Sequence, residues 1–121
     1  MIRYSKEHEW VRLDGTTATI GITDFAQSEL GDITFVELPE VGAEFAKDDV
    51  LCVVESVKAA SDIFAPVSGR VASVNTSLED APETVNNSAE DEGWICKIEG
   101  VDPADLQDLM DAEAYRAFCK S

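Results

Sequence analysis

The stretch VLCVVESVKAASDIFA, residues 50–65, contains two apolar runs separated by a short polar segment with a single lysine. Residues 49–55 and 60–65 are rich in Val, Ile, Phe and small side chains, a composition typical of buried strands. Residues 56–59 between them are few enough for a tight hairpin connection. The stretch therefore predicts two antiparallel strands that present Lys58 at an exposed tip.

Further short strands are predicted on both sides of this hairpin. A strand at 9–13 is followed by Asp14-Gly15, a typical hairpin turn. Many short strands separated by turn residues are typical of a β-sandwich or a flattened barrel. We therefore expect a mainly β fold in a single domain, residues 1–121, with a β core at about 9–99. The other predicted strands cover residues 16–23, 32–38, 70–75 and 94–99.

Helical patterns are short. Residues 24–30 read as one helix, with Asp24 as its N-cap and Gly31 as its stop. Two more short helices are predicted in the C-terminal segment at about 102–119, where they would pack on the sheet as a lid.

The first of these C-terminal helices begins at Asp102, which precedes a proline. Leu106, Leu109 and Met110 recur in it at helical spacing. The second begins at Asp111 and carries aromatic residues one turn apart. Their apolar residues are interpreted as core contacts and not as a cofactor site.

The chain is strongly acidic, with 25 Asp and Glu against 9 Lys and Arg and a formal net charge of −16. Nucleic-acid binding requires Lys and Arg to neutralise phosphates, so this class of function is excluded. An anionic membrane surface is disfavoured for the same reason, and the apolar runs are too short to span a bilayer. The charge suits contacts with proteins that carry basic patches, or it serves solubility alone.

The three cysteines, Cys52, Cys96 and Cys119, are far apart and form no Cys-x-x-Cys pair. We therefore expect neither a metal site nor a redox pair, and Cys52 and Cys96 are interpreted as small core residues. A reducing compartment follows. Because the N-terminal residues contain no signal-peptide core, we expect the bacterial cytoplasm, or the mitochondrial matrix if the chain is a processed eukaryotic form.

The predicted position of Lys58 suits attachment better than catalysis. Catalytic lysines are usually buried or placed beside another cation, whereas Lys58 is flanked by small residues, with Glu55 and Asp62 nearby. An amine at an exposed tip is accessible to a modifying enzyme, and group carriers such as biotin and lipoamide are mounted on lysine. An ordinary solvated hairpin lysine is the alternative.

Several segments together resemble the H-protein family of the glycine cleavage system along nearly the whole chain. They include HEWV (8–11), ATIGITDFAQSELGDI (18–33), VVESVKAASD (53–62) and EGWICKIE (92–99). The resemblance implies a lipoyl-domain-like fold, a barrel-sandwich hybrid. It also implies lipoate in amide linkage on Lys58. The modification motif around that lysine would be Glu55, Ser56, Val57 and Ala59.

By this resemblance the chain is a carrier in glycine catabolism and one-carbon metabolism, and not an enzyme. Its lipoyl arm, roughly 14 Å long from bond lengths, would take the aminomethyl group of glycine from glycine decarboxylase, the P protein. The arm would deliver it to the aminomethyltransferase, the T protein, and electrons to dihydrolipoamide dehydrogenase, the L protein. A lipoate ligase or lipoyltransferase would modify the chain, and a monomer is expected.

The family also shelters the loaded arm in a surface cleft, for which Glu9, Asp62 and His8 are the candidates here. Carboxylates at the first two positions would bind a protonated amine. The alternative for Glu9 and Asp62 is that they are solvated acids at a strand edge. The alternative for His8 is that it serves packing. Residues 87–92 depart from the Pro-Tyr pair that often occurs there in the family, so a partner contact made by that loop would differ.

Four other functions remain open at this point. A biotinyl carrier usually places its lysine between methionines, whereas Val57 and Ala59 flank Lys58, which favours lipoate. A lipoyl relay that donates lipoate to 2-oxoacid dehydrogenases would use the same modified lysine. An enzyme would need a nucleophile–base pair, a metal cluster or a phosphate loop, and none is evident in the sequence. A purely structural β domain would leave Lys58 unmodified.

Overall fold

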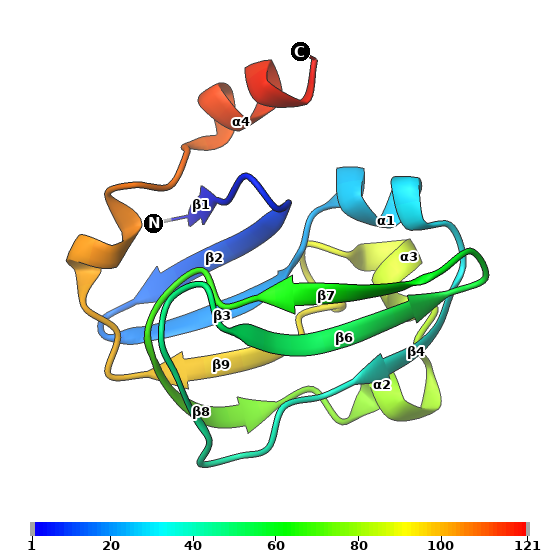
Figure 1. The fold of residues 1–121 in the computed structure, drawn as a ribbon, viewed down its shortest axis with the longest axis horizontal. Helices are drawn as coiled ribbons and strands as arrows, with labels where there is room; N and C mark the ends of the chain where they lie inside the picture. Colours follow the sequence, from blue (N-terminus) through cyan, green and yellow to red (C-terminus); the bar gives the residue numbers. More distant parts are fainter. Residues whose placement is uncertain (1, 121) are drawn as a thin grey trace.

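Two antiparallel sheets face each other across an apolar core in the computed structural model, which describes residues 2–120 (Figure 1). The larger sheet has the order β1 (Ile2–Tyr4), β2 (Glu9–Asp14), β3 (Thr17–Ile22), β9 (Cys96–Glu99), β8 (Gly69–Val74) and β5 (Glu44–Phe45). The smaller sheet has the order β4 (Ile33–Glu37), β6 (Val50–Ser56) and β7 (Ala60–Phe64). The prediction of a mainly β, flattened barrel-sandwich fold is confirmed.

The central hairpin is formed by β6 and β7, as predicted. Glu55 pairs with Ala60 next to the turn, and Val50 pairs with Phe64 at the far end. The register shifts once between Val50 and Cys52. Lys58 lies in the connection between the two strands, at one end of the smaller sheet.

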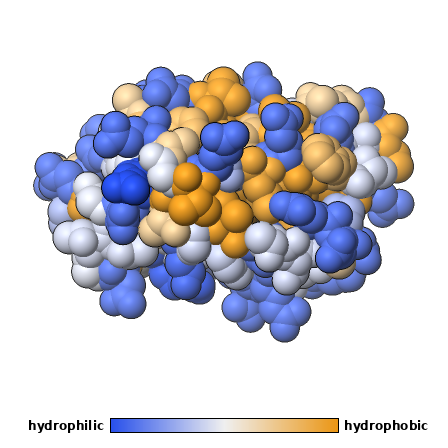
Figure 2. Space-filling view, turned by 90° about the horizontal axis from the view of Figure 1, so that it is seen from below, coloured by the Kyte–Doolittle hydropathy of each residue, from blue (hydrophilic) through white to orange (hydrophobic). Residues whose placement is uncertain are grey.

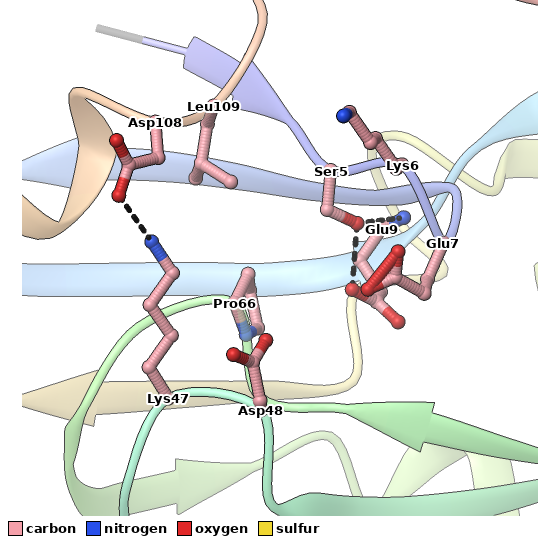
Figure 3. Close-up of a pocket in the computed structure, with 9 residues that line it drawn as sticks. All are labelled: Ser5, Lys6, Glu7, Glu9, Lys47, Asp48, Pro66, Asp108 and Leu109. Atoms are coloured by element: carbon pink, nitrogen blue, oxygen red, sulfur yellow. Dashed lines mark hydrogen bonds and ion pairs between the residues drawn. The ribbon is translucent and has the colours of Figure 1, made fainter.

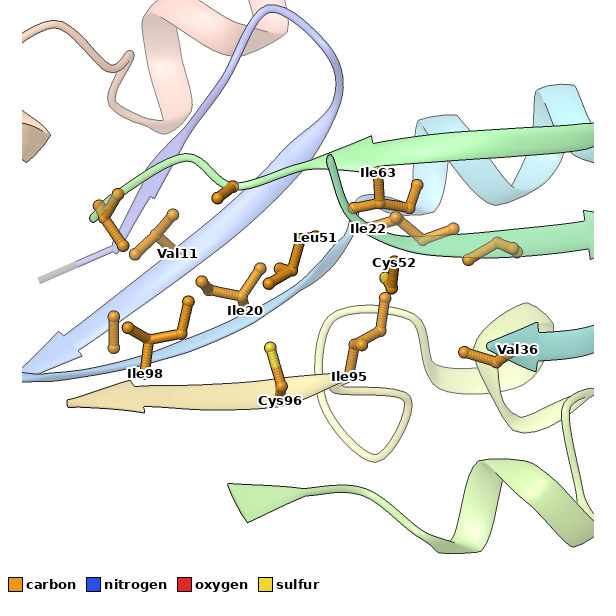
Figure 4. Packing of buried hydrophobic residues seen from close by; sticks show 14 of the residues in the cluster. Val11, Ile20, Ile22, Val36, Leu51, Cys52, Ile63, Ile95, Cys96 and Ile98 are labelled. Carbon is orange, nitrogen blue, oxygen red and sulfur yellow. The ribbon is translucent and has the colours of Figure 1, made fainter. Parts of the chain in front are cut away.

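The core fills the space between the sheets, with side chains from both (Figure 4). Val11, Ile20 and Ile98 come from the larger sheet and are completely buried. Cys52 and Cys96 lie in the core, as predicted, and burial raises the pKa of the Cys96 thiol to about 12. These thiols stay protonated and act as small apolar side chains.

The first helix, α1 (Asp24–Leu30), ends at Gly31 as predicted but has a different N-cap. The hydroxyl of Thr23, and not the carboxylate of Asp24, accepts the N–H of Ala26 at 3.1 Å. Thr23 is completely buried at the end of β3, where its hydroxyl also bonds the Tyr115 hydroxyl at 2.6 Å. Because that tertiary contact holds Thr23 in place, the prediction of Asp24 as the cap is wrong.

The C-terminal segment contains a single 3-10 turn, η1 (Pro103–Leu106), and a helix, α4 (Ala112–Cys119). Asp102 and Asp111 cap them, as predicted. The expected continuation of the first helix to Met110 is wrong, because Met110 exchanges two backbone hydrogen bonds of 2.8 Å with Tyr4.

Four elements were not predicted from the sequence: β1, β5 and two helices of four and five residues, α2 (Ser77–Asp80) and α3 (Thr84–Ser88). Each is short, and β1 is held by pairing with β2 and by the bridge to Met110. Within residues 2–120 there is no helix both long and apolar enough to cross a membrane.

Candidate functional site

The turn that carries Lys58 is ordered by the side chain of Ser56. The Ser56 hydroxyl oxygen accepts the N–H groups of Lys58 and Ala59 at 3.2 and 3.3 Å. The backbone N–H of Ser56 donates to the carbonyl of Ala59 at 2.9 Å. Val57 is 67% exposed, so the turn is held by these hydrogen bonds and not by burial of its apolar side chain. Lys58 is therefore exposed on a turn of defined shape.

The Lys58 side chain lies against the C-terminal end of α1. Its ammonium donates to the carbonyl of Glu29 at 3.3 Å, where the helix dipole favours a cation. The lysine stem passes over Gly31, where an added Cβ would lie 3.6 Å from Cε of Lys58. The N–H of Val57 donates to the carbonyl of Asp32 at 3.0 Å. These contacts direct the lysine along the helix.

Glu29, whose carbonyl accepts from the Lys58 ammonium, also lines a pocket of about 340 Å³. Its volume is at the small end of the roughly 300–1,000 Å³ typical of ligand pockets. Most of its wall is apolar, and carboxylates stand among the lining residues. The lining is Glu7, His8, Ile22, Phe25, Ala26, Glu29, Leu30, Ser61, Asp62 and Ile63.

His8 forms one wall of this pocket and is held rigidly. Its Nδ1 lies 2.7 Å from the hydroxyl of Tyr115, and its ring packs against Phe25 and Phe118 at centroid distances of 4.7 and 5.7 Å. Its φ of +67° is uncommon for a residue other than glycine. The structure thus supports the packing interpretation of His8, which nevertheless shapes the pocket next to Lys58.

Asp62 is exposed on β7 and lines the same pocket as His8. The structure therefore brings His8 and Asp62 together in one pocket, and Lys58 is connected to it through Glu29, whose carbonyl accepts from the ammonium. The exposure of Asp62 is also compatible with the alternative of a solvated strand-edge acid. Glu55 is exposed beside the turn, opposite Ala60.

Glu9 lines a different pocket, of about 280 Å³ (Figure 3), and Glu7 belongs to the lining of both pockets. The Glu9 side chain is buried, with only 1% of the residue exposed, so the alternative of a solvated strand-edge acid is wrong here. The hydroxyl of Ser5 donates to its carboxylate at 2.7 Å and the N–H of Phe64 donates at 3.1 Å. Glu9 thus links the two sheets and lies next to the Lys58 pocket, not in it.

Burial raises the pKa of the Glu9 carboxyl to about 7, despite the two donated hydrogen bonds that act in the opposite direction. The folded-state pKa therefore lies above the ordinary value near 4.5. The unfolded chain binds fewer protons at this site between these two values, so the stability contributed by Glu9 is full below pH 4.5. It is lost as the pH rises through 7.

We expect Glu9→Gln to remove this pH dependence, because glutamine cannot ionise. Its amide oxygen can accept from Phe64, and its amide nitrogen can donate to the Ser5 hydroxyl. Relative to the variant, the wild type should lose up to about 3 kcal/mol of unfolding free energy between pH 4.5 and 8. Urea unfolding at several pH values measures this. The exposed Glu44→Gln should keep the wild-type slope, and an unchanged slope in Glu9→Gln would contradict the assignment.

Three contributors to the site were missed from the sequence. Asn86 of α3 donates to the carbonyl of Gly31 and accepts from Ile33, which holds the connection beneath Lys58. Phe25 and Glu29 line the pocket from α1. The positions of Phe25 and Glu29 four residues apart on one short helix are the signal that would have indicated a shared face. No local pattern indicates the long-range role of Asn86.

Comparison with known proteins gives one family. The family described as "Glycine cleavage H-protein" matches residues 2–121. Among similar curated proteins, the glycine cleavage system H protein of Brevibacillus brevis is 56% identical over 119 residues, which cover 98% of this chain and 94% of the relative. That of Thermotoga maritima is 49% identical over 119 residues, which cover 98% and 96%.

A solved structure agrees with both comparisons. The crystal structure of a glycine cleavage system H protein from Mycobacterium marinum superposes with a TM-score of 0.87. It is 34% identical in sequence, and the match covers 96% of this chain and 94% of the solved chain. The likeness therefore extends over the two sheets and the C-terminal segment together.

Proposed function

Since this chain belongs to the glycine cleavage H-protein family, we propose that it carries lipoate in amide linkage on Lys58 and shuttles the aminomethyl group of glycine between enzymes. The chain itself is a carrier and not a catalyst. The observation that carries the proposal is the position of Lys58, exposed on an ordered turn with its ammonium 3.3 Å from the carbonyl of Glu29, a residue that lines the pocket.

The residues around Lys58 fit a lipoyl arm. When attached, lipoate supplies a dithiolane that accepts a carbon group and electrons and releases them again. Ile22, Phe25 and Leu30 provide apolar pocket walls for a hydrocarbon chain. The carboxylates of Glu7 and Asp62 belong to the same lining and would attract a protonated amine brought there.

The remaining residues of the site have supporting roles in this proposal. His8 keeps the pocket wall rigid through its contact with Tyr115. Glu9 adds negative charge behind Glu7 when it is ionised, from the neighbouring pocket. Enclosure by such walls limits the access of water to a bound group, which is the benefit of a cleft to a carrier of a labile cargo.

The proposed partners are glycine decarboxylase, the aminomethyltransferase, dihydrolipoamide dehydrogenase and a lipoate-attaching enzyme. The net charge of −16 favours partners with basic faces and speeds their encounter. Figure 2 shows that apolar residues gather near the centre of one face, surrounded by hydrophilic ones. Such a surface is suitable for short-lived protein contacts.

The bacterial cytoplasm is the proposed compartment.

Reconstitution tests this function. The lipoylated chain is mixed with the decarboxylase, the aminomethyltransferase and the dehydrogenase, together with glycine, tetrahydrofolate and NAD. We expect NADH formation that depends on this chain and is linear in its amount at low concentration. The same chain, purified from cells that cannot make lipoate, is the matched control and should give no NADH.

A different outcome separates the carrier from a lipoyl relay. If the lipoylated chain gives no NADH with active partner enzymes, the shuttle role is contradicted. Deletion of its gene would then be examined for loss of lipoate on the 2-oxoacid dehydrogenases. Loss of that lipoate, with glycine cleavage unaffected, would assign the relay role instead.

A further inference from the structure

The connection between α1 and β4 lies between α3 and the turn of Lys58, and Asn86 of α3 holds it from one side. The Asn86 side-chain oxygen accepts the N–H of Ile33 at 2.8 Å. The amide nitrogen donates to the carbonyl of Gly31 and to the side-chain oxygen of Gln27, both at 2.9 Å. One side chain thus bonds the last turn of α1, the connection and the first residue of β4.

The same connection contacts the Lys58 turn from the other side. The carbonyl of Asp32 accepts the N–H of Val57 at 3.0 Å. Gly31 lies under the lysine stem, and a Cβ added there would be in van der Waals contact with Cε of Lys58. Gly31 has a φ of +82°, a conformation that glycine adopts without strain. A continuous series of contacts thus connects Asn86 with Lys58 through Gly31 and Asp32.

Strand pairing reaches the connection at Ile33, opposite Ser56, and does not include Gly31 or Asp32. The β4–β6 register shifts between Ile33 and Phe35, so the ladder is irregular next to the connection. Val57 is exposed, so its side chain contributes little burial there. Removal of the Asn86 donors would leave the Gly31 carbonyl without that partner, and side-chain hydrogen bonds of this kind contribute about 1 kcal/mol each.

We propose that Asn86 is a positioning residue for the carrier lysine, because it holds residues 31–33 as a platform that directs Lys58 along α1 toward the pocket. This inference rests on the proposed function for the importance of Lys58. The geometric part, that Asn86 sets the direction of the lysine, is testable on the unmodified chain.

The test compares Asn86→Asp with Asn87→Asp. Aspartate at 86 can still accept the Ile33 N–H but loses both donors and places a carboxylate against the Gly31 carbonyl. Asn87 is exposed on the same helix, so Asn87→Asp makes the same charge change without touching the platform. Asn86→Ser, which removes both amide donors without adding charge, is the second variant if the first does not fold.

Amide exchange and NMR contacts are the readouts. We expect the Val57 N–H to exchange at least about tenfold faster in Asn86→Asp, since its partner Asp32 is no longer held. The Ser56 N–H should be unchanged, because its acceptor Ala59 lies within the turn itself. Cross-relaxation between the Lys58 Cε protons and the Gly31 Cα protons should disappear in Asn86→Asp and persist in Asn87→Asp.

Two results would overturn the proposal. One is unchanged Val57 exchange and an intact Lys58–Gly31 contact in a folded Asn86 variant. The other is an equal increase in exchange at all protected amides, including Ile20, which is the signature of a general loss of stability. The carrier role is tested separately, by mass spectrometry for lipoate on Lys58 in the same chain from lipoate-producing cells. An unmodified Lys58 with the expected NMR changes would keep the positioning role and remove the carrier role.

Discussion

Lys58→Arg is expected to abolish lipoylation and, with it, all glycine-dependent NADH formation in the reconstituted system. The guanidinium stays protonated in proteins and does not accept an acyl group, so no arm can be attached. The substitution keeps the positive charge and the long stem, and Lys58 is exposed. The fold and its stability should therefore be unchanged. Mass spectrometry of the chain and the NADH assay measure the two losses.

A second lysine provides the control for this experiment. Lys97 is exposed on β9, at 5.3 Å from the Trp94 ring centre. Lys97→Arg makes the same chemical change away from the hairpin and should leave both lipoylation and activity intact. Residual lipoylation of Lys58→Arg would mean that the arm is attached elsewhere, and it would contradict Lys58 as the attachment site.

Trp10→Ala is expected to lower the free energy of unfolding by about 4 kcal/mol. Trp10 is completely buried, and its indole N–H donates to the carbonyl of Ala89 at 2.9 Å. Its ring packs so closely on β3 that a Cβ at Gly21 would come within 2.8 Å of it. Truncation leaves a cavity beside Tyr4 and Tyr115 and removes the donor to Ala89. Urea unfolding at constant pH measures the loss.

The matched control is Trp94→Ala. Trp94 is half-buried and packs at the edge of the same aromatic cluster. Because less of its area is removed from water, its truncation should cost less than half as much. Equal losses for the two tryptophans would contradict the larger contribution expected of the fully buried Trp10.

The parts of the fold that could be predicted are those with local signals. Alternating and apolar runs located the hairpin around Lys58, and the side chains of Asp102 and Asp111 marked the starts of the C-terminal turn and helix. Such signals depend on neighbours within a few residues, where backbone geometry and capping act. Met110 was misassigned because its pairing with Tyr4 joins segments far apart along the chain.

The site was predictable where chemistry and motif coincide, and less so elsewhere. Lys58 could be predicted as the attachment site from its position between two strands and from the family resemblance. The burial of Glu9 could not be predicted, because it depends on Ser5 and on Phe64 of the opposite sheet. Asn86 is a polar residue in an unpredicted helix, and its importance comes entirely from partners more than fifty positions away. Hydrogen bonds of that range leave no periodic trace in a sequence.

The most direct test of the central claim is mass spectrometry of the intact protein and of its peptides, purified from the native cell. We expect a lipoyl increment, located on the peptide that contains Lys58. An unmodified Lys58 in cells that make lipoate and contain the attaching enzyme would contradict the carrier function. The chain would then have the H-protein fold but a different function.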